Sequence, residues 1–192
     1  MNHAEVKQFY DQMCRTFMVE DIRRSIHDAR ANYLVALGLF SYLEVIGGLI
    51  TGHGALPNSK KSTSNFNEAI KHLPQDYGDL DSKLRVTDAK GNTRSGLYNA
   101  FRCGLVHEYS PKGLVIVWND PGREPAVDRC GIKLETVDEH GTKRLAINNN
   151  ELFRDFQQLV EKVGQWVDDS DPTYYPRVRA VFERMAAYKV DS

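Results

Sequence analysis

The sequence is poor in cysteine and has almost no net charge, and both properties narrow the classes of protein to which it can belong. Its 192 residues contain three widely separated cysteines that form no C-x-x-C pair: Cys14, Cys103 and Cys130. An odd number of isolated cysteines argues against a disulfide scaffold and against a cysteine-rich zinc site. The 25 Lys and Arg residues nearly balance the 26 Asp and Glu residues, which excludes a protein that coats nucleic acid indiscriminately.

The chain also lacks the features that mark export or several domains. Its first twenty residues have neither a basic start nor a long apolar centre, because Glu5, Asp11 and Glu20 interrupt the apolar positions. A secretory signal is therefore not predicted. No internal repeat, low-complexity tract or linker divides residues 1–192, and this length is typical of one domain. We expect a single domain in a reducing cytoplasm.

One apolar run, residues 33–50, is long enough to span a membrane. Ser41 and Glu44 are its only clearly polar residues, and the chain has no second run of this kind. A charged Glu44 would be costly inside a bilayer. The alternative is a helix that is apolar on nearly all sides and is surrounded by other helices of the same domain. We expect this buried central helix and no membrane partner.

Hydrophobic periodicity predicts a mainly α-helical bundle with a small β insertion. Apolar residues at helical spacing predict the main helices over residues 3–19, 21–50, 95–109, 150–167 and 176–188. The helix at 95–109 is expected to begin at Thr93 or Ser95. Within residues 113–148 the period becomes strand-like, with short runs at 114–118, 132–136 and 145–147. We expect an antiparallel hairpin or three-stranded patch there, inserted into the helical domain.

Of the six histidines, His107 is the candidate for acid/base chemistry, because polar and basic residues lie near it on the same predicted helix. Asn99, Cys103 and His107 follow at four-residue intervals and share a helix face, with Arg102 adjacent. Arg102 and His107 form an R-x4-H pattern, and five residues of α-helix separate their side chains by about 140°. Both can line one groove if the arginine swings widely or a dimer supplies a second copy. A structural salt bridge or helix-end role is the other interpretation of this pair.

The R-x4-H pattern lies in the most basic part of the chain. Residues 82–112 contain six basic and two acidic side chains, whereas residues 148–192 contain six basic and eight acidic ones. This distribution fits an RNA-facing groove, and it fits a solvated basic loop equally well.

A helical domain with a long apolar helix near its start and R-x4-H on a later helix resembles the HEPN superfamily, whose motif is R-x4-6-H. The likeness covers residues 21–109 and 150–188, and its specific content is Arg102 and His107. Many superfamily members are metal-independent ribonucleases of toxin and defence systems. The resemblance thus implies a homodimeric endoribonuclease that requires neither a metal nor another cofactor.

RNA carries its own nucleophile in the 2′-hydroxyl group, so such an enzyme needs an acid or base and a cation at the phosphate. The resemblance assigns the first role to His107 and the second to Arg102. Four further residues are candidates for binding the substrate: Asn99, Tyr109, Arg94 and Lys112.

Two other interpretations remain open. In active members of the superfamily the residue after the arginine is usually Asn, Asp or His, whereas here it is Cys103. This difference favours a non-catalytic HEPN-like module that binds a nucleotide, an RNA or a protein partner of the antitoxin kind. The third interpretation is a plain helical scaffold, against which the basic flank of the motif argues.

Overall fold

The computed structural model describes residues 1–29, 32–54, 61–87, 91, 93–102, 115–118, 130–136 and 143–187. At positions 29, 86–87, 101–102, 115–118, 135–136 and 143–144 it describes the backbone alone. The α-helices are α1 (His3–Tyr10), α2 (Val19–Arg24), α3 (Asn32–Thr51), α4 (Ser62–Lys71), α5 (Gln75–Lys83), α7 (Asn149–Asp168) and α8 (Tyr175–Ala186). The π-helical segments are η1 (Asp11–Met18), η2 (Ser25–Ala29) and η3 (Tyr98–Arg102). The strands are β1 (Arg85–Thr87), β2 (Thr93–Ser95), β3 (Val115–Trp118), β4 (Ile132–Thr136) and β5 (Lys143–Asn148).

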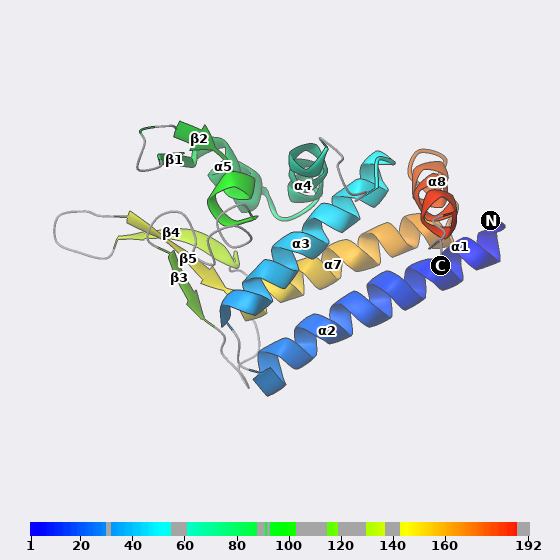
Figure 1. The fold of residues 1–192 in the computed structure, drawn as a ribbon, viewed down its shortest axis with the longest axis horizontal. Helices are drawn as coiled ribbons and strands as arrows, with labels where there is room; N and C mark the ends of the chain where they lie inside the picture. The colour runs from blue at the N-terminus through cyan, green and yellow to red at the C-terminus, as the bar shows by residue number, and fades with distance from the viewer. Residues whose placement is uncertain are drawn as a thin grey trace, which may run out of the picture.

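Residues 3–29 form one long helix in which α1, η1, α2 and η2 follow without a break (Figure 1). The predicted boundary between residues 19 and 21 is therefore wrong. Asp21 lies inside α2, and its carboxylate accepts a hydrogen bond from Tyr42 Oη of α3 at 2.7 Å. Asp21, where the second helix was expected to begin, thus lies in the first helix and connects it to α3.

The π-helical turns of this helix follow from the spacing of its buried side chains. Six buried residues recur every four positions: Val6, Tyr10, Cys14, Met18, Ile22 and Ile26. In a straight α-helix each four-residue step drifts by about 40° around the axis. Hydrogen bonds that span five residues widen the turn, so the stripe stays on one face. Phe17, an apolar residue of the same helix, lies outside this stripe and is 61% exposed.

Helix α3 is the centre of the fold, as its apolar composition predicts. It packs against α2, α4, α7, α8 and η3, and Figure 1 shows it running beside α7 through the middle of the molecule. Its mean hydropathy of 1.9 and its length would allow it to cross a membrane, but 61% of the apolar window is buried inside the fold. The prediction of a buried central helix is confirmed.

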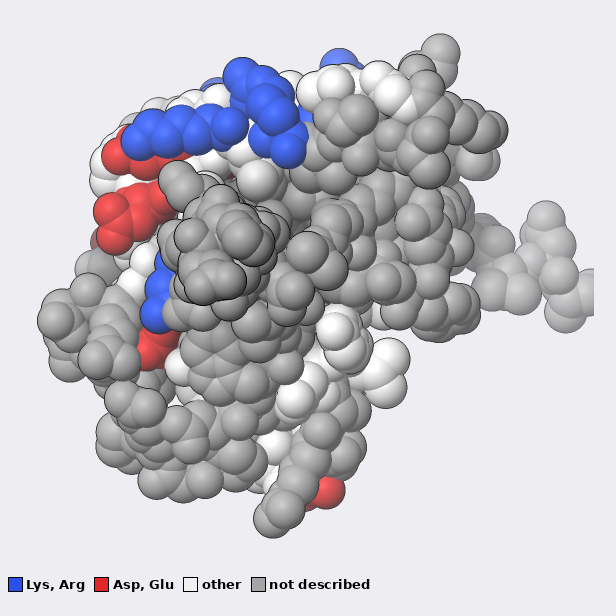
Figure 2. All heavy atoms as spheres, turned by 90° about the vertical axis from the view of Figure 1, so that its left-hand side faces the viewer, with Lys and Arg blue, Asp and Glu red and all other residues white. Residues whose placement is uncertain are grey.

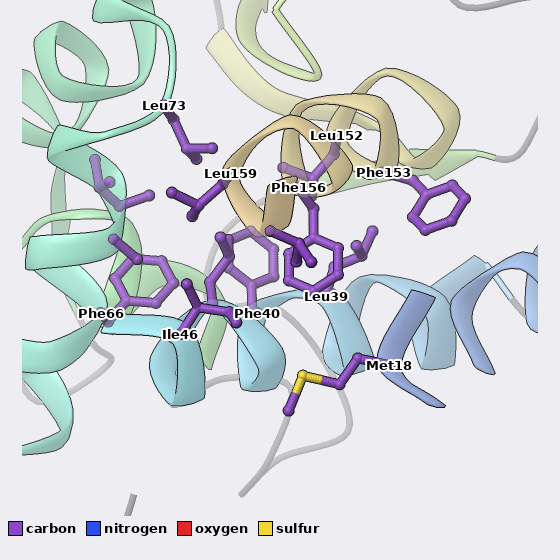
Figure 3. Packing of buried hydrophobic residues seen from close by; sticks show 14 of the residues in the cluster. Met18, Leu39, Phe40, Ile46, Phe66, Leu73, Leu152, Phe153, Phe156 and Leu159 are labelled. Carbon is purple, nitrogen blue, oxygen red and sulfur yellow. The ribbon is translucent and has the colours of Figure 1, made fainter. Parts of the chain in front are cut away.

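Three helices supply most of the core shown in Figure 3. Leu39, Phe40 and Ile46 of α3 meet Phe156 and its neighbours on α7, and Phe66 of α4 packs against Phe40 with ring centroids 5.7 Å apart. The contact between α3 and α4 is closest at Gly47, where an added Cβ would lie 1.7 Å from a backbone oxygen of α4. Glycine at this position therefore sets the separation of the two helices.

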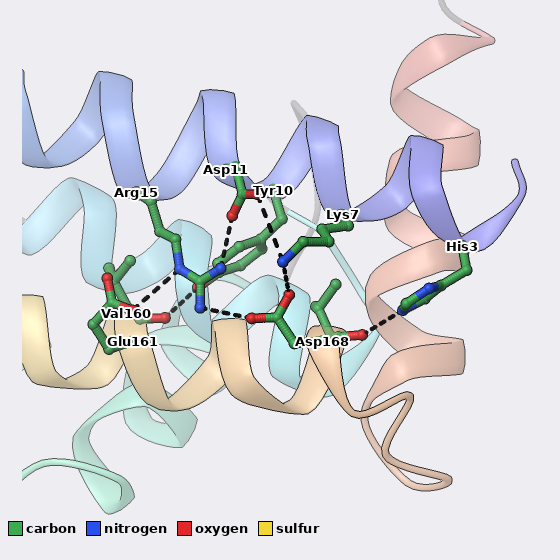
Figure 4. A network of polar contacts seen from close by, with 9 residues as sticks. His3, Lys7, Tyr10, Asp11, Arg15, Val160, Glu161 and Asp168 are labelled. Carbon is green, nitrogen blue, oxygen red and sulfur yellow. Dashed lines mark hydrogen bonds and ion pairs between the residues drawn. The ribbon is translucent and has the colours of Figure 1, made fainter.

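A polar network fixes the N-terminal helix to α7 (Figure 4). The Arg15 guanidinium donates to Asp11, Glu161 and Asp168, at 2.7, 3.1 and 3.1 Å. Lys7 also donates to Asp168, and this bond is the main reason why the pKa of that carboxyl lies below its usual value. These groups hold helices together, and we assign them a structural role.

The β insertion forms a three-stranded sheet in the order β3-β5-β4. Strands β4 and β5 pair antiparallel, with Leu134 opposite Leu145, as a hairpin requires. Strand β3 pairs parallel with β5, with Val117 opposite Ile147. The expected antiparallel hairpin is thus formed by β4 and β5, and the three-stranded patch as a whole is mixed. In the sheet β5 is the central strand, with β3 at one edge and β4 at the other. The chain therefore crosses from β3 to β4 before it returns as β5, and this crossover lets β3 and β5 run in the same direction. The predicted class, a mainly α-helical bundle with a small β insertion, is confirmed.

Candidate functional site

The helix that carries the R-x4-H pattern begins later than predicted. Thr93 to Ser95 form β2, which pairs antiparallel with β1. Gly96 then turns the chain with a φ of 90°, a conformation that L side chains rarely adopt. The backbone N–H of Gly96 donates to Leu84 O at 3.1 Å. The short hairpin of β1 and β2 therefore determines where η3 starts.

A carboxylate from another helix caps the start of η3. Asp81, near the end of α5, accepts the backbone N–H of Leu97 at 2.6 Å. A carboxylate at a helix N-terminus satisfies a free backbone donor and interacts favourably with the helix dipole. A Cβ at Gly96 would lie 2.8 Å from the same Asp81 oxygen. Glycine is thus required here both for the positive φ and for the approach of the cap.

The body of η3 is anchored in the core. Leu97 and Ala100 are fully buried, and the Tyr98 ring lies 5.5 Å from that of Phe66 in α4. Helix α3 packs against the same turn. Three elements, α3, α4 and α5, therefore fix the backbone of η3.

The structure describes three of the six predicted site residues in part or in full. Asn99 is half-buried, and its side-chain Nδ2 donates to Ser95 O at 2.7 Å, so this amide group supports the start of its own helix. Arg94 is exposed on β2, opposite Val86. Arg102 is described through its backbone, at the last described position of η3. The other predicted site residues, which are His107, Tyr109 and Lys112, lie outside the described residues. Cys103 lies outside them as well.

Basic side chains surround the start of η3. Lys83, Arg85 and Arg94 are exposed on α5, β1 and β2. Arg85 donates to two backbone oxygens, Ser82 O and Leu84 O, each at 2.8 Å. Figure 2 shows basic side chains along the upper edge of this face, over the hairpin, with acidic side chains beside them. The surface near η3 can therefore attract an anion locally without a large basic patch.

The sequence interpretation missed a buried polar cluster between α5, α7 and β4. Tyr77 Oη donates to Asp155 Oδ2 at 2.6 Å and accepts the Gly131 backbone N–H at 2.9 Å. Arg154 donates twice to the other oxygen of Asp155, at 2.6 and 2.8 Å. Burial and the neighbouring Cys130 and Asp155 raise the pKa of Tyr77 well above its usual range. A charged residue on the apolar face of α7, one turn after Leu152, is the signal that could have revealed this cluster.

The cluster is closed to solvent, with Tyr77 fully buried and Asp155 1% exposed. Its described hydrogen bonds use both oxygens of the carboxylate, so we assign it to stability. In the described parts of the chain, no three His, Cys, Asp or Glu side chains come together as a metal ligand set.

Comparison with known proteins leaves the site to be interpreted from its own residues. No model of a protein family matches the chain. Searches of curated proteins and of solved structures also give no match.

Proposed function

We propose that the chain is a HEPN-like, metal-independent endoribonuclease in which His107 is the general acid/base and Arg102 stabilises the charge of the reacting phosphate. The observation that carries the proposal is the anchoring of η3. The backbone of Arg102 is the last described position of a helical segment, η3, that α3, α4 and α5 contact on three sides. A cation that must meet a phosphate within a fraction of an ångström needs a support of this kind.

The proposed reaction uses these two groups in a transfer within the RNA. A base removes the proton of the 2′-hydroxyl group, whose oxygen attacks the adjacent phosphorus atom. The bond from phosphorus to the 5′-oxygen then breaks, and this oxygen receives a proton; the products are a 2′,3′-cyclic phosphate and a 5′-hydroxyl end. His107 transfers protons near neutral pH. Arg102 offers planar, permanently charged donors to the extra negative charge on phosphorus oxygens.

Cys103 supports a second candidate function, a HEPN-like module that binds RNA, a nucleotide or a protein without cleaving RNA. A thiol is a weaker hydrogen-bond partner than the Asn, Asp or His usual at this position in active members. In both functions we propose a homodimer, because a second copy places another Arg102 and His107 beside the first. Sedimentation of the purified chain measures this, and a strict monomer contradicts it.

RNA cleavage in the presence of EDTA tests the proposal. The purified chain and its His107→Ala and Arg102→Ala variants are incubated with mixed single-stranded RNA, with His27→Ala as the control. His27 is an exposed histidine on η2, so its removal controls for the loss of an imidazole elsewhere. We expect cleavage by the parent and by His27→Ala, and a loss of at least about 100-fold in the two site variants.

The outcomes separate the two candidate functions. Cleavage that is unchanged in His107→Ala refutes the proposed catalytic role. Absence of cleavage together with RNA binding that Arg102→Ala weakens supports the binding module. The salt dependence of that binding gives the number of phosphate contacts. Each phosphate that is neutralised on a single strand adds about 0.7 to the magnitude of the slope of the logarithm of the binding constant against the logarithm of the salt concentration.

A further inference from the structure

Glu44 is a buried charge in α3, the most apolar of the described helices. It lies within α3 among fully buried side chains such as Leu43 and Ile46, and it is 8% exposed. Burying a carboxylate costs several kcal/mol unless charges or hydrogen bonds compensate for it. A carboxylate at this position therefore needs a cation or hydrogen-bond donors close by.

The spacing of α3 shows which side of the helix Glu44 occupies. Phe40, Glu44 and Gly47 lie at i, i+4 and i+7 and therefore share one face. Phe40 packs against Phe66 of α4 (Figure 3), and Gly47 meets the backbone of the same helix. Glu44 lies between these two contacts, on the side of α3 that faces α4 and its neighbour η3.

The motif helix meets this side through the same aromatic residue. The Tyr98 ring of η3 packs against Phe66 at 5.5 Å, and Phe66 in turn packs against Phe40. Arg102 follows Tyr98 by four residues, about one helical turn. Glu44 and Arg102 are thus each one turn away from a ring that contacts Phe66.

The charges of these elements leave Arg102 as the natural counter-charge. On α4, Lys71 is exposed and donates to Glu68 of its own helix at 2.7 Å. The sequence of η3, YNAFR, contains one charged residue, Arg102. We propose that Glu44 is a positioning residue of the site, whose carboxylate balances the charge of Arg102 and orients it toward the RNA phosphate. The role in orientation rests on the proposed function, whereas the coupling of the two charges does not.

Such a pair has a clear chemical advantage at a phosphate site. A carboxylate that holds one edge of a guanidinium leaves the other donors free, and it fixes their direction before substrate binds. Gln has nearly the same shape as Glu but no charge, and Asp keeps the charge on a shorter stem. The variants Glu44→Gln and Glu44→Asp therefore separate the charge of this residue from its packing.

A double-mutant cycle on folding stability tests the coupling without any assay of activity. Urea unfolding is measured for Glu44→Gln, for Arg102→Gln and for the double variant. Each single change should raise the equilibrium constant for unfolding by some factor. We expect the double change to raise it by a factor at least tenfold smaller than the product of the two single factors, because the second change removes a charge that the first has already left uncompensated. The control cycle combines Glu44→Gln with Arg94→Gln, an exposed arginine on β2, and should be multiplicative within about twofold.

A multiplicative result for Glu44 and Arg102 overturns the proposal. If Glu44→Gln is too unstable to measure in buffer, the same cycle is measured in the presence of sucrose, which stabilises folded proteins by its exclusion from their surface. The same two criteria then apply.

RNA cleavage adds a readout that a purely structural Glu44 would not change. In the folded Glu44→Gln variant we expect kcat to fall at least tenfold with little change in KM, and Glu44→Asp to recover part of the loss. An unchanged kcat overturns the positioning role. Coupled charges in a chain that cleaves no RNA would refute the proposed function alone, while cleavage with uncoupled charges would refute the role of Glu44 alone.

Discussion

The buried hydroxyl group of Tyr77 provides the sharpest test of how this fold is held together. It donates to Asp155 at 2.6 Å and accepts the backbone N–H of Gly131 at 2.9 Å. These two bonds join α5, α7 and the residue that precedes β4. The change Tyr77→Phe removes the oxygen and keeps the ring, so it isolates the two hydrogen bonds.

The expected cost follows from the two groups that lose their partner. The buried N–H of Gly131 is left without an acceptor, which costs about 1–3 kcal/mol, and the bond to a charged carboxylate contributes about 1.5–3 kcal/mol. Arg154 still donates twice to Asp155, so the carboxylate keeps a counter-charge and the penalty of an unpaired buried charge is avoided. We expect a loss of about 3–4 kcal/mol, or roughly 6–16 °C in Tm for a domain of this size.

Urea unfolding followed by far-ultraviolet circular dichroism measures this loss. Tyr33→Phe is the matched control, since Tyr33 is 47% exposed and its substitution should change stability by less than about 0.5 kcal/mol. The m-value should stay constant, because the change removes one atom and does not alter the surface that unfolding exposes. A loss in Tyr77→Phe as small as that in the control would refute the assignment of these bonds to stability.

Two further predictions concern helix packing and pH. Gly47→Ala should destabilise the fold by several kcal/mol, because its Cβ would lie 1.7 Å from an α4 backbone oxygen and this clash outweighs the gain of about 1 kcal/mol in helix propensity. Gly78→Ala in α5, whose Cβ meets nothing closer than 3.7 Å, should stabilise by up to about 1 kcal/mol; equal urea midpoints for the two variants would contradict this. Burial, and then the charge of Lys162, lower the pKa of His72 below its usual 6.5. The unfolded chain therefore takes up this proton first, and stability should decline as pH falls through about 6.5 toward the lowered value. His72→Gln should weaken this decline and the exposed control His27→Gln should keep it, as urea midpoints measured across this range will show; parallel pH profiles for all three proteins would count against the prediction.

Much of the fold follows from local patterns in the sequence. Residues 33–50 are apolar on nearly all sides, and the helix that they form is central because contacts on several sides keep most of such a surface from water. The C-terminal helices are recognised by their single apolar stripe, and β4 with β5 by strict alternation. The predicted helix starts were less accurate. The start of η3 depends on Gly96 and on Asp81, which lies 15 residues earlier in the sequence.

The candidate site was predictable in part. The R-x4-H pattern and the basic segment around it are visible in the sequence. The residues that hold η3 are not, because Asp81 and Phe66 act from separate helices and leave no local pattern. Glu44 stood out as the one charge in an apolar run, but its place on the side of α3 that faces α4 and η3 needed the packing of Phe40 against Phe66.

The sequence by itself determined the helical class, the central position of residues 33–50 and the position of the β insertion, because periodicity and enclosure depend on the order of side chains alone. Tertiary structure decided which elements meet. It extends the first helix to Ala29, makes β3 parallel to β5, and brings Tyr77 to Asp155 across 78 positions. A helix or strand reveals from its own residues which face must be covered, but the covering partner depends on the free energy of the whole packed chain.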